Sequence, residues 1–244
     1  MKLAVAGKGG VGKTTLVALL AREAVARGYR VLAVDADPNA TLAATLGFPA
    51  PMVSLAEQED LIAQRVGAGL VNLNPTVDDI PDRYGVERDG IRLLVVGGIR
   101  RGGGGCACAA NAFLRALLRH LILKRDEVVL VDMEAGIEHL GRGTAQGVDA
   151  LVVVVDPDRR SLDTVARILP LAEDIGLRRV VVVGNKVRDR EEEDFIRHGL
   201  PRVPFLGSIP LCEELGRVGR GEPLPSPAPP AVQNLFTRLA DLTR

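Results

Sequence analysis

Nine residues near the N-terminus, from Gly7 to Thr15, have types and spacing that suit phosphate binding. The stretch GKGGVGKTT fits the pattern G-x-x-x-x-G-K-[ST], in which backbone N–H groups of a glycine-rich loop surround phosphate oxygens. In that pattern Lys13 contacts the β- and γ-phosphates, and the Thr14 hydroxyl binds Mg²⁺. The predicted nucleotide-binding residues of the loop are Gly9, Gly10, Val11, Gly12, Lys13, Thr14 and Thr15.

A second lysine, Lys8, lies inside this loop in a chain that has only five lysines and uses arginine as its usual cation. A compact ammonium group with three donors suits a phosphate better than a solvated surface position. The pattern K-G-G-x-G-K-T-T resembles the deviant phosphate loop of the MinD, ParA and nitrogenase iron-protein group. That resemblance implies an ATP-sandwich homodimer, in which Lys8 of one subunit reaches the nucleotide of the other and joins Lys13 in catalysis.

The elements on either side of the loop are those that a phosphate site requires. Residues 2–6 (KLAVA) predict a buried strand, and residues 14–27 predict a helix with apolar side chains at helical spacing. The loop therefore joins a strand to a helix N-terminus, where freed N–H groups and the helix dipole favour an anion.

A second buried strand, predicted at residues 30–36, leads into the stretch DADPNATL. Carboxylates at the carboxyl end of a parallel strand lie beside the phosphate loop in this type of sheet. Asp35 or Asp37 could orient an attacking water or hold the magnesium shell. The resemblance to MinD and ParA identifies this stretch as the first switch and implies that Asp37 supports hydrolysis.

Residues 127–132 (EVVLVD) predict the strand that carries the second carboxylate of a phosphate-loop enzyme. We expect Asp132 to hold Mg²⁺ through water, alongside Thr14 and Asp37. The stretch 133–143 resembles the second switch of the same group, which implies that Gly136 senses the γ-phosphate.

Two cysteines, Cys106 and Cys108, follow a run of four glycines and precede a helix predicted at residues 110–124. A loop feeding a helix N-terminus favours the thiolate, which is the form that binds metal. Each chain supplies two thiolates and a tetrahedral Zn²⁺ site needs four, so a two-fold dimer would complete a four-cysteine site on its axis. The alternative is that both are small apolar residues packed in a loop.

The phosphate loop, DADPNATL, the C-x-C pair and DMEAGIEHLGRG at 132–143 together resemble the CooC-type ATPases, which assist nickel insertion into carbon monoxide dehydrogenase, and the related AcsF proteins linked to acetyl-CoA synthase. The likeness covers nearly the whole chain. It implies Ni²⁺ or Zn²⁺ at a dimer interface, held by Cys106 and Cys108, and an apo carbon monoxide dehydrogenase or acetyl-CoA synthase as client. Thiolates accept both metals, so the residue types leave the metal open.

The stretch NKVRD at 185–189 follows a valine-rich strand and leaves the identity of the base open. It resembles the N-K-x-x-D guanine reader of small GTPases, with Asp189 on the guanine edge. In CooC-like proteins the asparagine alone reads adenine, so we expect ATP with Asn185 as the base contact and GTP as the alternative. The turn Ile209, Pro210 and Leu211 resembles the second adenine wall of that family.

Composition sets the fold class and excludes some partners. The 244 residues are 47% hydrophobic and carry 31 acidic and 31 basic residues, without a linker or charge block that would mark a second domain. We therefore expect one α/β phosphate-loop domain over residues 1–244, with a mostly parallel sheet of seven or eight strands and helices on both faces.

The balanced charge predicts no nucleic-acid partner, and the short apolar runs predict no membrane span. Three cysteines and the phosphate loop favour a cytoplasmic location.

Two rival functions remain open from the sequence. An iron-sulfur electron-transfer ATPase of the nitrogenase iron-protein type would hold a cluster with the same four cysteines. A MinD- or ParA-like positioning ATPase would make the C-x-C pair incidental. The leading prediction is a homodimeric ATPase that is switched by nucleotide and passes nickel to its client.

Overall fold

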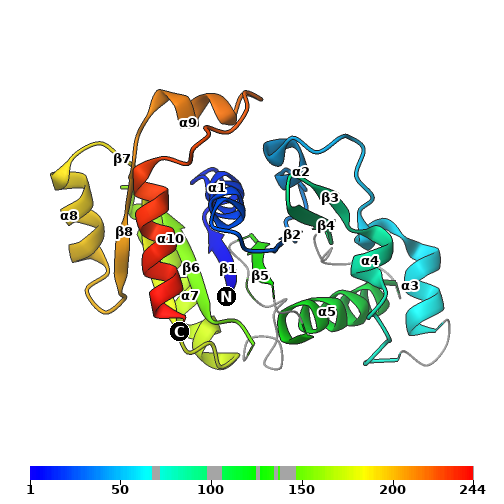
Figure 1. The fold of residues 1–244 in the computed structure, drawn as a ribbon. Coiled ribbons are helices and arrows are strands. Elements are labelled where there is room, and N and C mark those ends of the chain that lie inside the picture. Colours follow the sequence, from blue (N-terminus) through cyan, green and yellow to red (C-terminus); the bar gives the residue numbers. More distant parts are fainter. Residues whose placement is uncertain (68–71, 98–105, 125–126, 135–136, 138–146, 244) are drawn as a thin grey trace.

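The described part of the chain forms one eight-stranded sheet with the order β3-β4-β2-β5-β1-β6-β7-β8 (Figure 1). This computed structural model describes residues 1–67, 72–97, 106–124, 127–134, 137 and 147–243, with the backbone alone at 106–108, 111 and 122–124. Neighbouring strands run parallel except β3 and β4, which form an antiparallel pair at one edge. The strands are β1 (Lys2–Gly7), β2 (Val31–Asp35), β3 (Val86–Arg88), β4 (Ile91–Val95), β5 (Val128–Asp132), β6 (Ala150–Val155), β7 (Val180–Val187) and β8 (Phe205–Pro210).

Helices cover both faces of the sheet, as predicted for this fold class. Helices α1 (Lys13–Ala26), α2 (Leu42–Leu46) and α10 (Pro230–Leu242) pack on one face, and α3 (Glu59–Val66), α5 (Cys106–Lys124) and α7 (Arg159–Asp174) pack on the other. The helices are α1 (Lys13–Ala26), α2 (Leu42–Leu46), the 3₁₀ turn η1 (Leu55–Glu57), α3 (Glu59–Val66), α4 (Ile80–Tyr84), α5 (Cys106–Lys124), α7 (Arg159–Asp174), α8 (Arg190–Gly199), α9 (Glu213–Val218) and α10 (Pro230–Leu242).

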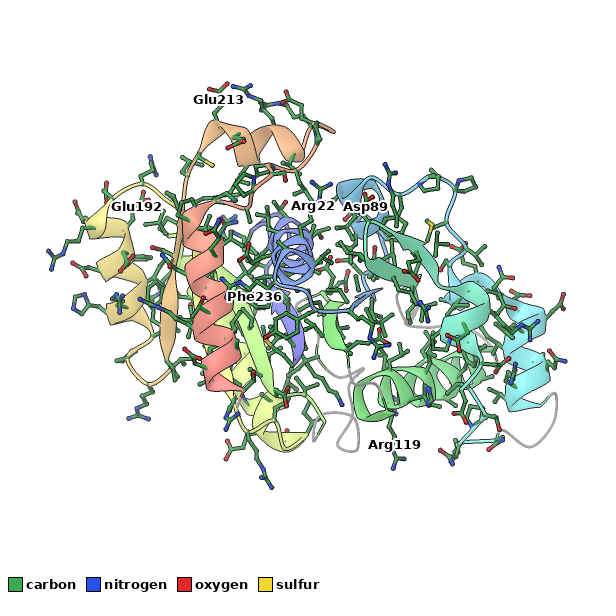
Figure 2. All side chains as sticks on the ribbon, viewed as in Figure 1. Arg22, Asp89, Arg119, Glu192, Glu213 and Phe236 are labelled. Atoms are coloured by element: carbon green, nitrogen blue, oxygen red, sulfur yellow. The ribbon has the colours of Figure 1, made fainter. Side chains whose placement is uncertain are left out.

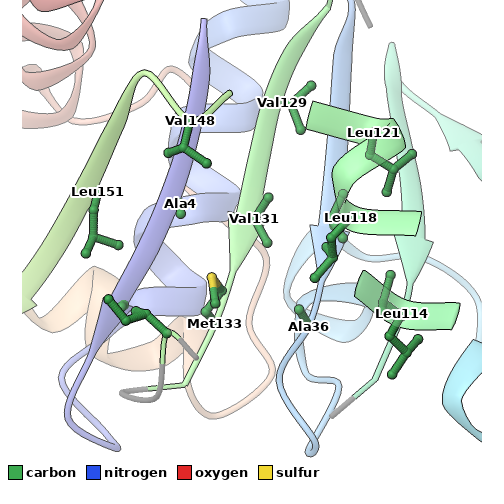
Figure 3. Packing of buried hydrophobic residues seen from close by; sticks show 14 of the residues in the cluster. Ala4, Ala36, Leu114, Leu118, Leu121, Val129, Val131, Met133, Val148 and Leu151 are labelled. Carbon is green, nitrogen blue, oxygen red and sulfur yellow. The ribbon is translucent and has the colours of Figure 1, made fainter. Parts of the chain in front are cut away.

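The central strands are buried on both faces, which explains their near-continuous apolar sequences. In β1, Leu3 and Val5 pack toward α1, whereas Ala4 belongs to the layer of α5 and α7 on the opposite face. Figure 3 shows this second layer, where Leu118 of α5 lies over Val131 of β5. The period-2 alternation of strand side chains thus fills two hydrophobic layers with one sheet.

The order of the strands places a ligand crevice at the end of β1. β1 lies between β5 and β6. The chain continues from β1 to β2 in one half of the sheet and from β5 to β6 in the other half, so the strand order reverses at β1. In open α/β sheets, ligands bind outside the carboxyl ends of the strands at such a point of reversal. The segments that follow β1, β2, β5, β6 and β7 all emerge at this edge because those strands are parallel.

The last helix docks on the core, as its apolar face predicts. Val232, Leu235, Phe236 and Leu239 are each at most 2% exposed. Phe236 lies on the side of α10 that faces α1 (Figure 2), and the Arg27 guanidinium stands 4.7 Å from its ring centre. Within the described part of the chain, no helix combines the length and apolar content needed to cross a bilayer.

Two element boundaries differ from the sequence prediction. Helix α5 begins at Cys106, not near residue 110, so both cysteines lie in its first turn and not on a loop. Strand β7 continues to Val187, so Asn185 lies within the strand and does not follow it. In both cases the structure extends an element through residues that sequence patterns alone assign to a loop.

Candidate functional site

The phosphate loop has the backbone conformation that its glycines allow. Gly10 and Gly12 have φ values of 78° and 95°, in the left-handed region that side chains disfavour. Gly7 ends β1 with its α-carbon against the Val154 carbonyl of β6, where a Cβ atom would clash with that oxygen. Helix α1 begins at Lys13 directly after Gly12, so the free N–H groups of its first turn face the loop.

Lys13 and Thr14 lie at the start of α1, beside the phosphate loop. Lys13 is 7% exposed, and its Nζ donates to the carbonyl of Lys8 at 3.4 Å across the inside of the loop. The Thr14 hydroxyl lies 3.5 Å from that of Thr41, which ends the loop after β2. Two hydroxyl groups and one ammonium group therefore converge on the mouth of the phosphate loop.

Asp35 organises the turn that carries Asp37. Its two carboxylate oxygens accept from the backbone N–H groups of Asp37 at 3.2 Å and Leu42 at 2.9 Å, at the two ends of the turn. Burial raises the pKa of Asp35 to about 6. Asp37 is 9% exposed, and its Oδ1 accepts from the backbone and side chain of Asn39. Asp35 is therefore a structural support of the turn, and Asp37 is a nearly buried carboxylate within that turn.

Asp132 at the end of β5 is fully buried beside these groups. Neither of its carboxylate oxygens has a hydrogen-bond partner among the described residues. Burial raises the pKa of Asp132 to about 7. The nearby Thr14 hydroxyl opposes this rise, although it lies outside hydrogen-bond geometry. A buried carboxyl group without a partner is costly unless a ligand satisfies it. Asp132 is thus suited to hold a cation and its water shell.

Lys8 is paired within its own chain. Its Nζ lies 2.6 Å from Oδ2 of Asp158, which caps the N-terminus of α7 just after β6. This contact raises the pKa of Lys8 and lowers the pKa of Asp158. Both side chains remain accessible, at 30% and 42%. The described conformation therefore keeps Lys8 at the surface, next to its own loop, where it can be released at little cost.

The predicted base contacts line one cavity beside the loop. Asn185 of β7, with Ile209, Pro210 and Leu211 at the end of β8, forms its walls together with residues of α1 and α9. Asn185 is 9% exposed, and its Nδ2 donates to the Val11 carbonyl at 2.7 Å. The structure thus places Asn185 next to three consecutive residues at the end of the adjacent strand.

Asp189 does not join this cavity. Its side chain caps α8 by accepting from the backbone N–H of Glu192 at 2.9 Å, and it lines a separate surface depression. The described residues therefore do not assemble the guanine reader that the N-K-x-x-D spacing left open. A carboxylate used as a helix cap is not available to the base edge.

The predicted metal ligands Cys106 and Cys108 are the first and third residues of α5. Positions two apart lie about 200° apart around a helix axis, because each residue turns it by about 100°. Among the described residues, no group of three or more His, Cys, Asp or Glu side chains is arranged to hold a metal ion. Gly136, the expected γ-phosphate sensor, lies outside the described residues.

The sequence prediction missed two residues of the site. Asp158 lies 150 positions from Lys8, so no spacing signal could pair them. Thr41 lies in the predicted first switch, where its hydroxyl group could have been recognised from the sequence as a further oxygen donor near the phosphate loop. It is exposed, and its side chain does not cap α2.

Comparisons with known proteins identify the family of this chain. Residues 2–224 match the family described as the CobQ/CobB/MinD/ParA nucleotide binding domain. The chain is 46% identical to the carbon monoxide dehydrogenase accessory protein CooC of Rhodospirillum rubrum, covering 86% of this chain and 84% of that one. It is 42% identical to an uncharacterized ATP-binding protein of Methanocaldococcus jannaschii, covering 99% and 98% of the two chains.

Among solved structures, a chain of the MinC:MinD cell division protein complex of Aquifex aeolicus shares the fold, with a TM-score of 0.69 at 22% identity over 99% of this chain and 96% of that one. The chain therefore belongs to the CobQ/CobB/MinD/ParA nucleotide-binding family and, within it, is a CooC-type ATPase.

Proposed function

We propose that the protein is a nucleotide-switched homodimeric metallochaperone that uses ATP hydrolysis to assist nickel insertion into carbon monoxide dehydrogenase or acetyl-CoA synthase. The observation that carries the proposal is the phosphate loop with Lys8 held at its surface, in a chain 46% identical to a carbon monoxide dehydrogenase accessory protein.

The phosphate loop and the first turn of α1 bind the phosphates. The backbone N–H groups of Gly9, Gly10, Val11, Gly12, Lys13, Thr14 and Thr15 surround the phosphate oxygens. Lys13 already has its ammonium group inside the loop, on the Lys8 carbonyl, and transfers it to the β- and γ-phosphates. Asp37 orients the attacking water from the neighbouring turn.

The residues present fit a magnesium ion. Asp132 offers a buried carboxylate without a partner, and Thr14 and Thr41 present their hydroxyl groups toward each other. Magnesium prefers six oxygen ligands and retains several waters, so a site with few protein ligands beside a phosphate loop suits it. When bound, the ion neutralises charge that develops on the phosphates. Thr14 would be its direct protein ligand, with Asp132 and Asp37 holding its water.

Dimerisation would free Lys8 from Asp158. A negatively charged triphosphate on the partner subunit competes for the ammonium group, and an exposed ion pair offers little resistance. Lys8 then neutralises charge on the partner's nucleotide during hydrolysis, as Lys13 does within its own chain. Loss of the γ-phosphate would weaken this contact and return Lys8 to Asp158.

The base cavity favours adenine. One N–H of the Asn185 amide is used on the Val11 carbonyl, which fixes the amide plane. The Asn185 Oδ1 then remains to accept from an exocyclic amino group, which adenine has at the position where guanine has a carbonyl. Asp189, the residue that would favour guanine, is used as a helix cap.

The nickel cargo would be held by Cys106 and Cys108 from both subunits. In the described conformation these positions start α5 and lie on different sides of the helix, which does not favour a shared metal. Binding one ion with both cysteines therefore requires the first turn of α5 to unwind.

The function is tested by nickel transfer to a nickel-free carbon monoxide dehydrogenase. The protein is loaded with Ni²⁺, freed of excess metal, and mixed with the apoenzyme and a nickel chelator, with or without Mg-ATP. We expect activation of CO oxidation that requires ATP and is lost in Lys13→Ala and in Cys106→Ser/Cys108→Ser. Cys212→Ser tests whether the loss is specific to the C-x-C pair: Cys212 precedes α9 and lines the base cavity, so this variant should still transfer nickel at saturating ATP.

The same preparation separates the rival functions. Activation that is independent of ATP and of the two cysteines would contradict the metallochaperone proposal. Iron and a visible absorption band in the anaerobically purified dimer would favour an electron-transfer ATPase instead.

A further inference from the structure

Two consecutive residues of β7 hold two consecutive carbonyl groups of the phosphate loop. Asn185 Nδ2 donates to the Val11 carbonyl at 2.7 Å, and Lys186 Nζ donates to the Gly10 carbonyl at 2.7 Å. The loop follows β1, and β6 separates β1 from β7 in the sheet. These two hydrogen bonds therefore tie the loop to a strand that is not its neighbour.

An unusual backbone conformation makes this double contact possible. In a regular strand, successive side chains point to opposite faces, so Asn185 and Lys186 could not both reach one loop. Lys186 has a φ of 59°, in the left-handed region, and the register between β7 and β8 shifts between Gly184 and Val187. This local break in the strand turns both side chains toward the loop. A lysine in the left-handed region is disfavoured, so we infer that the hydrogen bond from Lys186 to the Gly10 carbonyl offsets this backbone strain.

The two contacts orient the N–H groups that a phosphate would use. A trans peptide unit is planar, so its C=O and the N–H that follows point in opposite directions. Fixing the Gly10 and Val11 carbonyls toward β7 therefore directs the N–H groups of Val11 and Gly12 the other way. The Val11 N–H points toward the Lys8 carbonyl, on which Lys13 Nζ also lies, and this is the inside of the loop.

We propose that Lys186 is a positioning residue that, with Asn185, holds the phosphate loop in its phosphate-binding conformation. Three of the five lysines in the chain, Lys8, Lys13 and Lys186, then serve this one loop. A lysine suits the task because its single nitrogen ends a flexible stem on one carbonyl, whereas the planar arginine fork favours bidentate partners. The inference depends on phosphate binding by the loop and is independent of the metal cargo.

A second role for Lys186 has to be separated from this one, because the residue also lines the base cavity. A direct contact with base or ribose would affect adenosine binding. A positioning role acts on phosphate, so it affects ADP and pyrophosphate and leaves adenosine unchanged. Competition of the three ligands against a fluorescent ADP analogue distinguishes the two roles.

The test variant is Lys186→Asn, because asparagine tolerates the left-handed conformation and is too short to reach Gly10. We expect its affinity for ADP and for pyrophosphate to fall about ten-fold or more, as for a lost hydrogen bond from a charged donor. We expect adenosine affinity and the midpoint of thermal unfolding to stay at the parent values. Lys186→Arg, which keeps a long cationic donor, should recover part of the affinity for both phosphate ligands.

The control is Asp89→Asn, which changes another left-handed residue at the turn between β3 and β4 and should leave all three affinities unchanged. If Lys186→Asn lowers the unfolding midpoint, Lys186→Gly removes the strain as well as the side chain and should show the same loss for phosphate ligands without that decrease. An equal loss for adenosine and ADP would assign Lys186 to the base, and unchanged ADP affinity in both variants would overturn the inference.

Discussion

Asp35 and Asp132 are partners across β2 and β5, and both side chains are fully shielded from solvent. The two carboxyl groups differ in their hydrogen bonds. Asp35 accepts from two backbone N–H groups of the switch turn, whereas Asp132 has no partner among the described residues. Two equivalent positions of the sheet thus provide one structural carboxylate and one carboxylate that is available to a cation.

The first prediction concerns pH and the variant Asp132→Asn. Burial raises the pKa of Asp132 from 3.8 to about 7, so the folded protein binds more protons than the unfolded chain between about pH 4 and pH 7. The contribution of Asp132 to the free energy of unfolding therefore falls as the pH rises from about 4 to about 7, and it stays constant above about pH 7. Asp132→Asn removes the cost of the buried charge and should stabilise the nucleotide-free protein at pH 8, by up to about 4 kcal/mol.

Denaturant unfolding of parent and variant at pH 5 and pH 8 measures this effect. The variant should gain stability at pH 8 and little at pH 5, while losing the contribution of Mg²⁺ to ATP binding. A variant that is less stable than the parent at pH 8 would show that the Asp132 carboxylate has a stabilising partner.

The second prediction is that Lys13→Ala abolishes Mg²⁺-dependent ATP hydrolysis. The substitution removes the ammonium group from inside the loop, where it would contact the β- and γ-phosphates. Phosphate release is measured with Lys2→Ala as the control, because Lys2 begins β1 at the opposite end of the strand from the loop. Turnover by Lys13→Ala at the parent rate would show that the assigned site is wrong.

The third prediction concerns the Lys8 and Asp158 pair. Lys8→Ala should keep ATP binding but lose hydrolysis and ATP-promoted dimerisation, because its ammonium group acts on the partner's nucleotide. Asp158→Asn releases Lys8 from its ion pair and should lower the ATP concentration needed for dimerisation by a few-fold.

Light scattering with ATP measures both variants. A Lys8→Ala dimer that forms like the parent would leave Lys8 as an ordinary loop residue. An Asp158→Asn protein that loses dimerisation would show that Asp158 contributes to the interface directly.

The fourth prediction is that Thr41 contributes to magnesium binding. Its hydroxyl lies 3.5 Å from that of Thr14 and does not cap α2. Thr41→Val should reduce the gain in ATP affinity that Mg²⁺ provides, while affinity in EDTA stays at the parent value. In the control Thr45→Val, the lost hydroxyl donates to the Thr41 carbonyl within the same helix, so the magnesium effect should be unchanged. Equal behaviour of the two variants would exclude Thr41 from the site.

The sequence predicted those parts of the structure that depend on local patterns. The valine-rich strands, the strand-loop-helix unit around Lys13 and the docked face of α10 follow from periodicity and glycine spacing, and the structure confirms them. The contacts of Lys8 with Asp158 and of Lys186 with Gly10 join residues 150 and 176 positions apart, and no spacing rule describes such pairs. The helical start at Cys106 was missed because the preceding glycines indicate a loop.

Asn185 illustrates an intermediate case. The motif predicted a base contact, and the structure places the residue in the wall of the cavity beside the phosphate loop, where it also donates a hydrogen bond to the Val11 carbonyl. A sequence motif identifies a residue as part of a site without separating contact with the ligand from support of the loop. Only the fold, which brings β7 against the phosphate loop, makes the second contact visible.

We propose that nucleotide and metal favour the same closed dimer, with one metal shared by four cysteines. If both ligands favour that dimer, an ATP analogue must increase metal affinity by the same factor by which metal increases the affinity for the analogue. A direct measurement is Ni²⁺ or Zn²⁺ titration of parent, Cys106→Ser/Cys108→Ser and Cys212→Ser protein, with and without a non-hydrolysable ATP analogue. We expect one tightly bound metal ion per dimer in the parent and the Cys212→Ser protein, with higher metal affinity in the presence of the analogue. We expect no tightly bound metal in the double variant. One tight metal per monomer, or tight binding that survives the double substitution, would contradict the proposal.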